Sequence, residues 1–153
     1  MDASMFLGQL GAGLAVGLAA VGSSLGAGAA GMSAAGAWAK DVRAGKPLRF
    51  IYIVLVSAPI TQTVYGFLVM LQLAGKLGMV GTHGGTLFGI GLATGLGEML
   101  SAWMQGAIGA GGCRMLSEAD GEGVARVIIA IGVAETVGIF TLIFMSILLG
   151  QIV

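Results

Sequence analysis

The chain has few charged residues, one cysteine, one histidine and two prolines. Charged residues make up 9% of its 153 positions, whereas ordinary soluble domains have about 25%. The single cysteine, Cys113, excludes an internal disulfide and a cysteine metal cluster. The formal net charge is zero and no basic patch interleaved with aromatics is present, so nucleic-acid binding is excluded. This composition is not that of a soluble domain.

What the chain does have is apolar length and glycine. Apolar residues make up 57% of the sequence, and 29 residues are glycine without a Gly-X-Y period, which excludes collagen. Hydropathy predicts four membrane spans at about 5–38, 50–74, 84–115 and 124–150. Each is long enough, because ~20 apolar residues cross the ~30 Å hydrocarbon layer. We therefore predict an all-α membrane protein with a single membrane domain, 1–153.

The two halves of the chain resemble each other. Residues 25–31 in the first span are similar to residues 105–111 in the third, and residues 62–67 in the second to residues 135–140 in the fourth. Both pairs run in the same direction, so they indicate a duplicated helical hairpin and not an inverted transporter repeat. The predicted hairpins are residues 1–76 and residues 77–153.

Glycines four residues apart recur in the first and third spans. Small residues at this spacing share one helix face and let helix backbones approach closely in lipid. We expect close helix contacts at Gly13/Gly17, Gly22/Gly26, Gly85/Gly89 and Gly91/Gly95.

Basic residues gather around two of the three predicted loops. Only Lys76 lies near the middle loop, which spans about residues 75–85. Because cytoplasmic loops carry the excess of Lys and Arg, we expect the 1–2 and 3–4 loops in the cytoplasm and both termini outside, in a cell membrane. The basic residues concerned are Lys40, Arg43, Lys46, Arg49, Arg114 and Arg126.

Glu135 is the only charged residue in the apolar run 127–149. A carboxylate at that depth costs roughly 2.5–3.5 kcal/mol on insertion scales, so it is a candidate functional site. The second span places Ala58, Thr61, Gln62 and Tyr65 on one helix face. Pro59 directly follows Ala58 and lacks a backbone N–H, so we expect a kink there.

The polar groups in the spans are compatible with either of two transported ions, a hard cation or a proton. Gln105 adds a third-span amide to the oxygens of Thr61 and Gln62, and a hard cation requires several such oxygens. A proton requires only one carboxyl group held neutral, in which case the glutamines would serve as hydrogen-bond partners between helices. The full set favours a cation site.

With these residues the chain resembles a known family: the four-helix proteolipid, or K/c, subunit of rotary V-type ATPases, in its sodium-binding branch. The resemblance covers essentially the whole chain and is most specific at residues 59–67, Gln105-Gly106 and residues 134–136. It implies that Glu135 binds Na⁺ and that Tyr65 hydrogen-bonds this glutamate. The remaining implied ligands are Thr61, Gln62, Gln105 and the backbone carbonyl of Ala58.

The resemblance also implies a mechanism. Copies of this non-catalytic subunit would form a ring with the first and third helices inside, turning against a stator membrane subunit and coupled through central-stalk subunits to ATP hydrolysis or synthesis. Two alternatives stay open: the same ring carrying H⁺ at Glu135, and a small four-helix proton-coupled exporter. Glu98 has no role in the resemblance; it could be buried and protonated, face a ring lumen, or influence ion binding.

Overall fold

The computed structural model describes residues 2–152, with the backbone alone for residues 79–82. All regular elements in these residues are helical, and four segments are long and apolar enough to cross a membrane. The prediction of an all-α chain with four spans is therefore confirmed. The elements are α1 (Ala3–Arg43), α2 (Ile51–Ser57), the 3-10 turn η1 (Ala58–Ile60), α3 (Thr61–Lys76), the 3-10 turn η2 (Leu77–Met79), α4 (Val80–Glu118) and α5 (Val124–Gly150).

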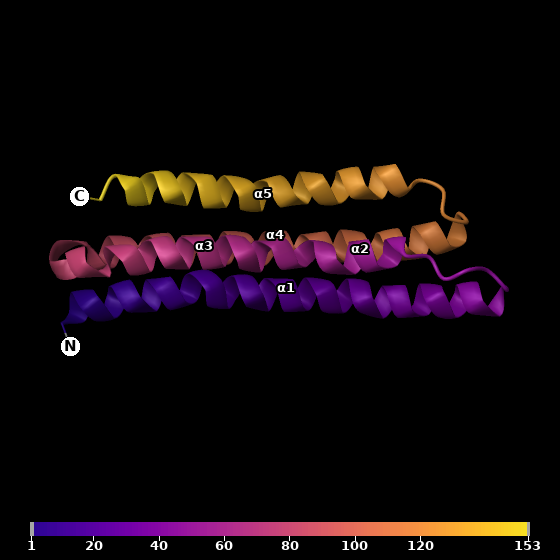
Figure 1. Ribbon diagram of the computed structural model, residues 1–153, viewed down its shortest axis with the longest axis horizontal. Coiled ribbons are helices and arrows are strands. Elements are labelled where there is room, and N and C mark those ends of the chain that lie inside the picture. The colour runs from indigo at the N-terminus through magenta and orange to yellow at the C-terminus, as the bar shows by residue number, and fades with distance from the viewer. Residues whose placement is uncertain (1, 153) are drawn as a thin grey trace.

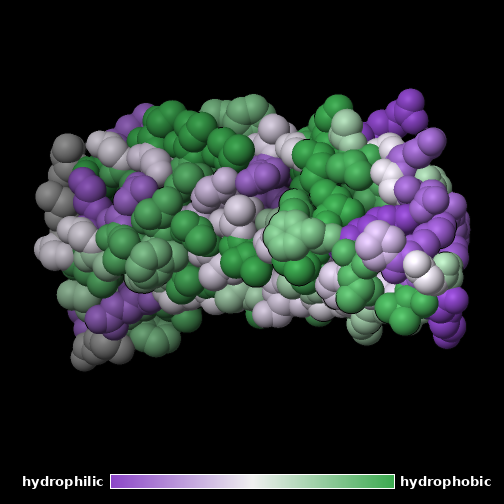
Figure 2. Space-filling model, turned by 45° about the vertical axis from the view of Figure 1, so that its right-hand side comes forward, coloured by the Kyte–Doolittle hydropathy of each residue, from purple (hydrophilic) through white to green (hydrophobic). Residues whose placement is uncertain are grey.

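The helices lie side by side along one long axis. Both ends of the chain and η2 lie at one end of the bundle, and the two connections after α1 and α4 lie at the other, which we call the loop end (Figure 1). Hydrophilic residues gather most densely at the loop end, and hydrophobic residues cover most of the middle (Figure 2). On the face shown in Figure 2, hydrophobic surface thus lies beside a polar loop end, and four helices are long and apolar enough to cross a membrane.

The contact between α1 and α4 depends on glycine. A side chain at Gly22 would collide with the backbone of Met99, and one at Gly106 with the backbone of Gly26. Of the four predicted glycine pairs, Gly22/Gly26 and Gly91/Gly95 lie in this contact. A Cβ at Gly13, Gly17, Gly85 or Gly89 would meet no other atom of the subunit within 4 Å. These two pairs lie on the opposite faces of the same helices, away from the α1–α4 contact.

The second span changes helix type at Pro59. The 3-10 turn η1 replaces one turn of α-helix there, as expected from the missing N–H of proline. The carbonyl of Leu55, which would have accepted that hydrogen bond, faces α4, where a Cβ on Gly109 would lie 2.9 Å from its oxygen. Both the proline and the glycine therefore shape the path of α2 and α3 over α4.

The turn between the hairpins is shorter than predicted. We expected a polar break over residues 75–85, but only Leu77–Met79 separate α3 from α4. The helix can begin at Val80 because its first turns contact α1: the N–H of Gly84 donates to Ser4 Oγ at 3.1 Å. Tertiary contact here overrides the weak helix propensity of the glycine-rich segment.

Arg49 joins the two hairpins at the loop end. Its Nη1 lies 3.0 Å from the carbonyl oxygen of Leu116, 3.2 Å from the hydroxyl of Tyr52 and 3.4 Å from Oδ1 of Asp41. Its Nη2 pairs with Asp120. Asp41 is only 1% exposed, so this guanidinium neutralises a buried carboxylate and links α1 to the end of α4.

Candidate ion-binding site

Glu135 lies in the middle of α5 and is half-buried in the isolated subunit. The hydroxyl of Tyr65 on α3 donates a hydrogen bond to its Oε1 at 3.0 Å. This is the contact that the family resemblance implies for these two residues. It places the carboxylate at the seam between α3 and α5, near the side of the bundle that faces away from α1.

Three of the expected oxygen ligands meet at the 3-10 turn. Thr61 Oγ1 lies 3.0 Å from the carbonyl oxygen of Ala58 and 2.8 Å from Oε1 of Gln62. Gln62 is completely buried, and its Nε2 has no hydrogen-bond partner. Because η1 starts α3 at Thr61, the turn presents a carbonyl, a hydroxyl and an amide oxygen together.

Gln105 lies on α4 and is also completely buried, with neither amide atom hydrogen-bonded. One turn earlier on the same face, Ser101 donates to the carbonyl of Ala134 at 2.8 Å. Ala134 directly precedes Glu135, so this bond holds the Gln105 face of α4 against the part of α5 that carries the carboxylate. The structure shows no direct bond between Gln105 and Glu135.

Glu98 points into the space between α3, α4 and α5. It is completely buried, and neither carboxyl oxygen has a hydrogen-bond partner. A Cβ on Gly138 would lie 2.6 Å from its Oε2 and 3.0 Å from Nε2 of Gln62. Of the three possibilities open from sequence, an exposed position facing a lumen is therefore wrong for this subunit, since the carboxyl lies beside the Gln62 side chain.

A second chain of polar side chains, which was not predicted from the sequence, lies behind the site. Thr63 Oγ1 donates to Ser23 Oγ at 2.7 Å, and Ser23 Oγ donates to the carbonyl of Pro59 at 2.6 Å. These bonds connect α1 to the 3-10 turn and hold the backbone next to Ala58. The available signal was weak, because serine and threonine in apolar helices commonly bond their own helix, as Thr136 does here.

The site therefore contains several buried polar atoms without a hydrogen-bond partner: Nε2 of Gln62, both amide atoms of Gln105 and both carboxyl oxygens of Glu98. Each buried polar atom without a partner costs about 1–3 kcal/mol; a bound cation would satisfy the oxygens, and the amide N–H groups need an acceptor. No group of three or more His, Cys, Asp or Glu side chains forms a metal site among the described residues. A cation here would be held by carboxylate and neutral oxygens, the ligands that hard cations prefer.

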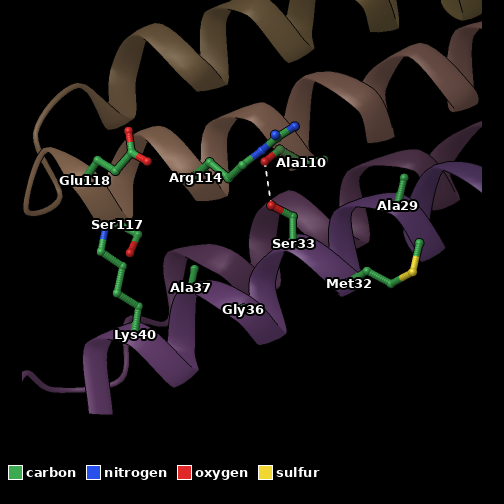
Figure 3. Close-up of a pocket in the computed structure, with 10 residues that line it drawn as sticks. All are labelled: Ala29, Met32, Ser33, Gly36, Ala37, Lys40, Ala110, Arg114, Ser117 and Glu118. Carbon is green, nitrogen blue, oxygen red and sulfur yellow. Dashed lines mark hydrogen bonds between the residues drawn. The ribbon is translucent and has the colours of Figure 1, made fainter. Parts of the chain in front are cut away.

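A separate groove opens between α1 and α4 at the loop end. It has a volume of about 420 Å³, and the side chains of Lys40, Arg114 and Glu118 line it (Figure 3). Ser33 on α1 also lines the groove and donates to the carbonyl of Ala110 on α4 at 2.7 Å (Figure 3). None of its lining residues is a candidate ion ligand, so the groove is separate from the Glu135 site.

Fold and site together define a duplicated helical-hairpin membrane proteolipid with one carboxylate on its last helix. The chain belongs to the ATP synthase C-subunit family, whose sequence model matches residues 10–73 and again residues 88–148. The double match confirms the predicted duplication. Members of this family are non-catalytic rotor subunits that form rings, so the predicted class is confirmed and the exporter alternative has no support.

One curated relative is similar over nearly the whole chain. The A-type ATP synthase subunit K of Methanocaldococcus jannaschii is 37% identical over 146 residues, which cover 95% of this chain. The chain spans 62% of the length of that relative.

Proposed function

We propose that this chain is the rotor-ring subunit of a rotary ATPase and carries Na⁺ across the membrane at Glu135. The observation that carries the proposal is a pair of buried amides on the helices that pack against the Glu135 segment of α5: Gln62 on α3 and Gln105 on α4 are fully buried. Thr61 and Ala58 place two further oxygens beside Gln62. A proton needs one carboxyl group, whereas Na⁺ needs several oxygens.

The surface of the subunit supports a ring with α1 and α4 inside. Large apolar side chains stand exposed along α5, at Ile129, Val133, Phe140 and Ile147, and suit contact with lipid. By contrast, the outward faces of α1 and α4 expose glycines such as Gly13 and Gly89. Narrow faces fit the smaller circumference of an inner wall, and wide faces fit the outer one.

In this arrangement ion binding neutralises Glu135 and lets the subunit pass through the lipid-facing part of each turn. A stator membrane subunit with a basic residue would displace the ion into one aqueous access path. Central-stalk subunits would connect the ring to the ATP-hydrolysing or ATP-synthesising head. By the distribution of basic residues, the loop end faces the cytoplasm and the termini face outward.

Sodium-dependent carbodiimide labelling tests the ion. Dicyclohexylcarbodiimide should modify the half-buried Glu135, as located by mass spectrometry, and leave the fully buried Glu98 unmodified. Na⁺ should slow the reaction, because a bound cation blocks the carboxyl group. Labelling of Glu135 that is insensitive to Na⁺ from micromolar to molar concentration would overturn the sodium proposal and leave the ring with the H⁺ alternative.

Replacing a single glutamine tests the ligand set. Gln105→Leu should weaken sodium protection by roughly tenfold or more, since it removes a ligand oxygen and leaves the other groups unpaired. Gln72→Leu is the matched control, because Gln72 is exposed on α3 and belongs to no site contact. Equal sodium protection in the two variants would make Gln105 a structural residue.

A further inference from the structure

Glu98 is the polar group that the proposed function does not use. It is completely buried within one subunit, so neither lipid nor a neighbouring copy reaches it without rearrangement. It takes part in none of the ion pairs of the described residues. The ionisable groups of the α3–α5 seam beside it are Tyr65 and Glu135, which bond each other.

The neighbour that complements Glu98 is Gln62. The Glu98 Oε2 acceptor and the Gln62 Nε2 donor lie 2.6 and 3.0 Å from the same point, the Cβ position that Gly138 leaves empty. Both atoms lack a hydrogen-bond partner, so the structure does not show a bond between them. A hydrogen bond between them satisfies one buried donor and one buried acceptor at the same time, which is worth more inside a protein than in water.

The direction of the Gln62 amide decides whether it can bind a cation. Its Oε1 lies on the Thr61 side, 2.8 Å from Oγ1. Turning the amide over would direct the N–H groups toward the cation position, where they repel positive charge. Only the oxygen of an amide is an acceptor, so an acceptor on the far side of Gln62 selects the orientation that binds Na⁺.

We propose that Glu98 is a positioning residue of the sodium site: its carboxyl oxygen accepts the Nε2–H of Gln62 and keeps Oε1 directed toward Thr61 and the ion. This role rests on the proposed sodium function. It holds for either protonation state, because both the carboxylate and the carboxylic acid present an acceptor oxygen. Gly138 belongs to the same arrangement, since its missing side chain leaves the space in which the two groups meet.

Two substitutions of Glu98 separate an acceptor from a charge. Glu98→Gln keeps a carbonyl acceptor, and we expect the sodium concentration that half-protects Glu135 from carbodiimide to stay within about threefold of wild type. Glu98→Leu removes the acceptor and should raise that concentration roughly tenfold. The labelling rate without sodium and the migration of the assembled ring should be unchanged in both, which a purely structural role would not predict.

A pair of glycine substitutions tests the same contact from α5. Gly138→Ala puts a methyl group against both Glu98 Oε2 and Gln62 Nε2 and should weaken sodium protection by a similar factor. Gly132→Ala is the control, because a Cβ there meets nothing within 4 Å of the subunit. This pair also decides the matter if Glu98→Leu fails to assemble.

The outcomes separate the two proposals. If wild-type labelling is insensitive to sodium, the sodium function fails and the positioning role fails with it. If wild type is protected but Glu98→Leu, or Gly138→Ala, is protected equally well, the positioning role alone is overturned. Loss of protection in Glu98→Gln equal to that in Glu98→Leu would also overturn it, because charge and not an acceptor would then be the property required.

Discussion

At the scale of single residues, Tyr65 gives the most direct test of the Glu135 environment. In the described part of the chain, the carboxyl of Glu135 accepts one hydrogen bond, from this hydroxyl at 3.0 Å. A hydrogen bond to a charged group contributes about 1.5–3 kcal/mol. Tyr65→Phe should therefore weaken sodium protection of Glu135 roughly tenfold or more, measured as the sodium concentration that halves the carbodiimide reaction.

The control for this change is Tyr52→Phe. It removes a hydroxyl of the same kind at the loop end, where Tyr52 contacts Asp41 and Arg49. Sodium protection should stay at the wild-type value in this variant. An unchanged sodium requirement in Tyr65→Phe would show that the hydroxyl contributes nothing to ion binding.

Asp120 gives a residue-scale prediction for pH. The hydrogen bond from Lys46, followed by the charges of Lys46 and Arg49, lowers the pKa of this carboxyl below its ordinary value of 3.8. A lowered folded-state pKa means that the contact is complete above about pH 4 and is lost as pH falls below it. Hydrogen exchange of residues 118–123, corrected for intrinsic rates, should accelerate at acidic pH. Asp120→Asn should abolish that acceleration. If exchange in the wild-type protein does not accelerate at acidic pH, the prediction is contradicted.

Some site residues could be predicted from sequence and others could not. Glu135 and Gln62 stand out because each is strongly polar in an apolar span. Ser23 and Thr63 do not, since small hydroxyl residues satisfy themselves within a helix. The direction of Glu98 follows from the rotation of α4 against α3 and α5, which packing determines and a seven-residue spacing to Gln105 does not.

At the scale of helices, the α1–α4 contact predicts that replacing two glycines of α1 by alanine changes the stability of the subunit by different amounts. Gly22→Ala should destabilise the detergent-solubilised subunit by about 1–3 kcal/mol, because the new methyl group overlaps the backbone of Met99. Gly28→Ala meets nothing within 4 Å in the subunit and should be neutral or slightly stabilising through helix propensity. Thermal unfolding followed by circular dichroism measures both, and equal midpoints would contradict a close contact at Gly22.

The elements themselves followed from the sequence within a few residues. Long apolar runs predict spans because length and hydropathy suffice, and Pro59 predicts a break because its ring removes a donor. The short η2 turn did not follow, since the contact of Gly84 with Ser4 involves residues 80 positions apart. For the same reason, the spacing of Gly13/Gly17 could not tell a contact within the subunit from a face that is open.

At the scale of the whole molecule, the two hairpins are joined at both ends of the bundle. Lys76 Nζ donates to the carbonyl of Ile152 at 2.7 Å near the termini, and Arg49 links Asp41 to Leu116 and Asp120 at the loop end. Between them the joining is mainly apolar packing and glycine contact. The polar links at the two ends thus fix the two hairpins as one body.

The contact of Arg49 with Asp41 predicts that one substitution lowers the stability of the subunit and that a second substitution restores part of it. Arg49→Met removes the cation beside the buried Asp41, and breaking such a pair from one side costs roughly 3 kcal/mol or more. Asp41→Asn combined with Arg49→Met should recover much of the loss, because the carboxylate left without its cation is then absent. Unfolding of the detergent-solubilised subunit by heat, followed by circular dichroism, gives the two midpoints. If the double variant is no more stable than Arg49→Met, neutralising Asp41 recovers nothing, and the loss in Arg49→Met comes from the bonds of Arg49 to Tyr52, Leu116 and Asp120.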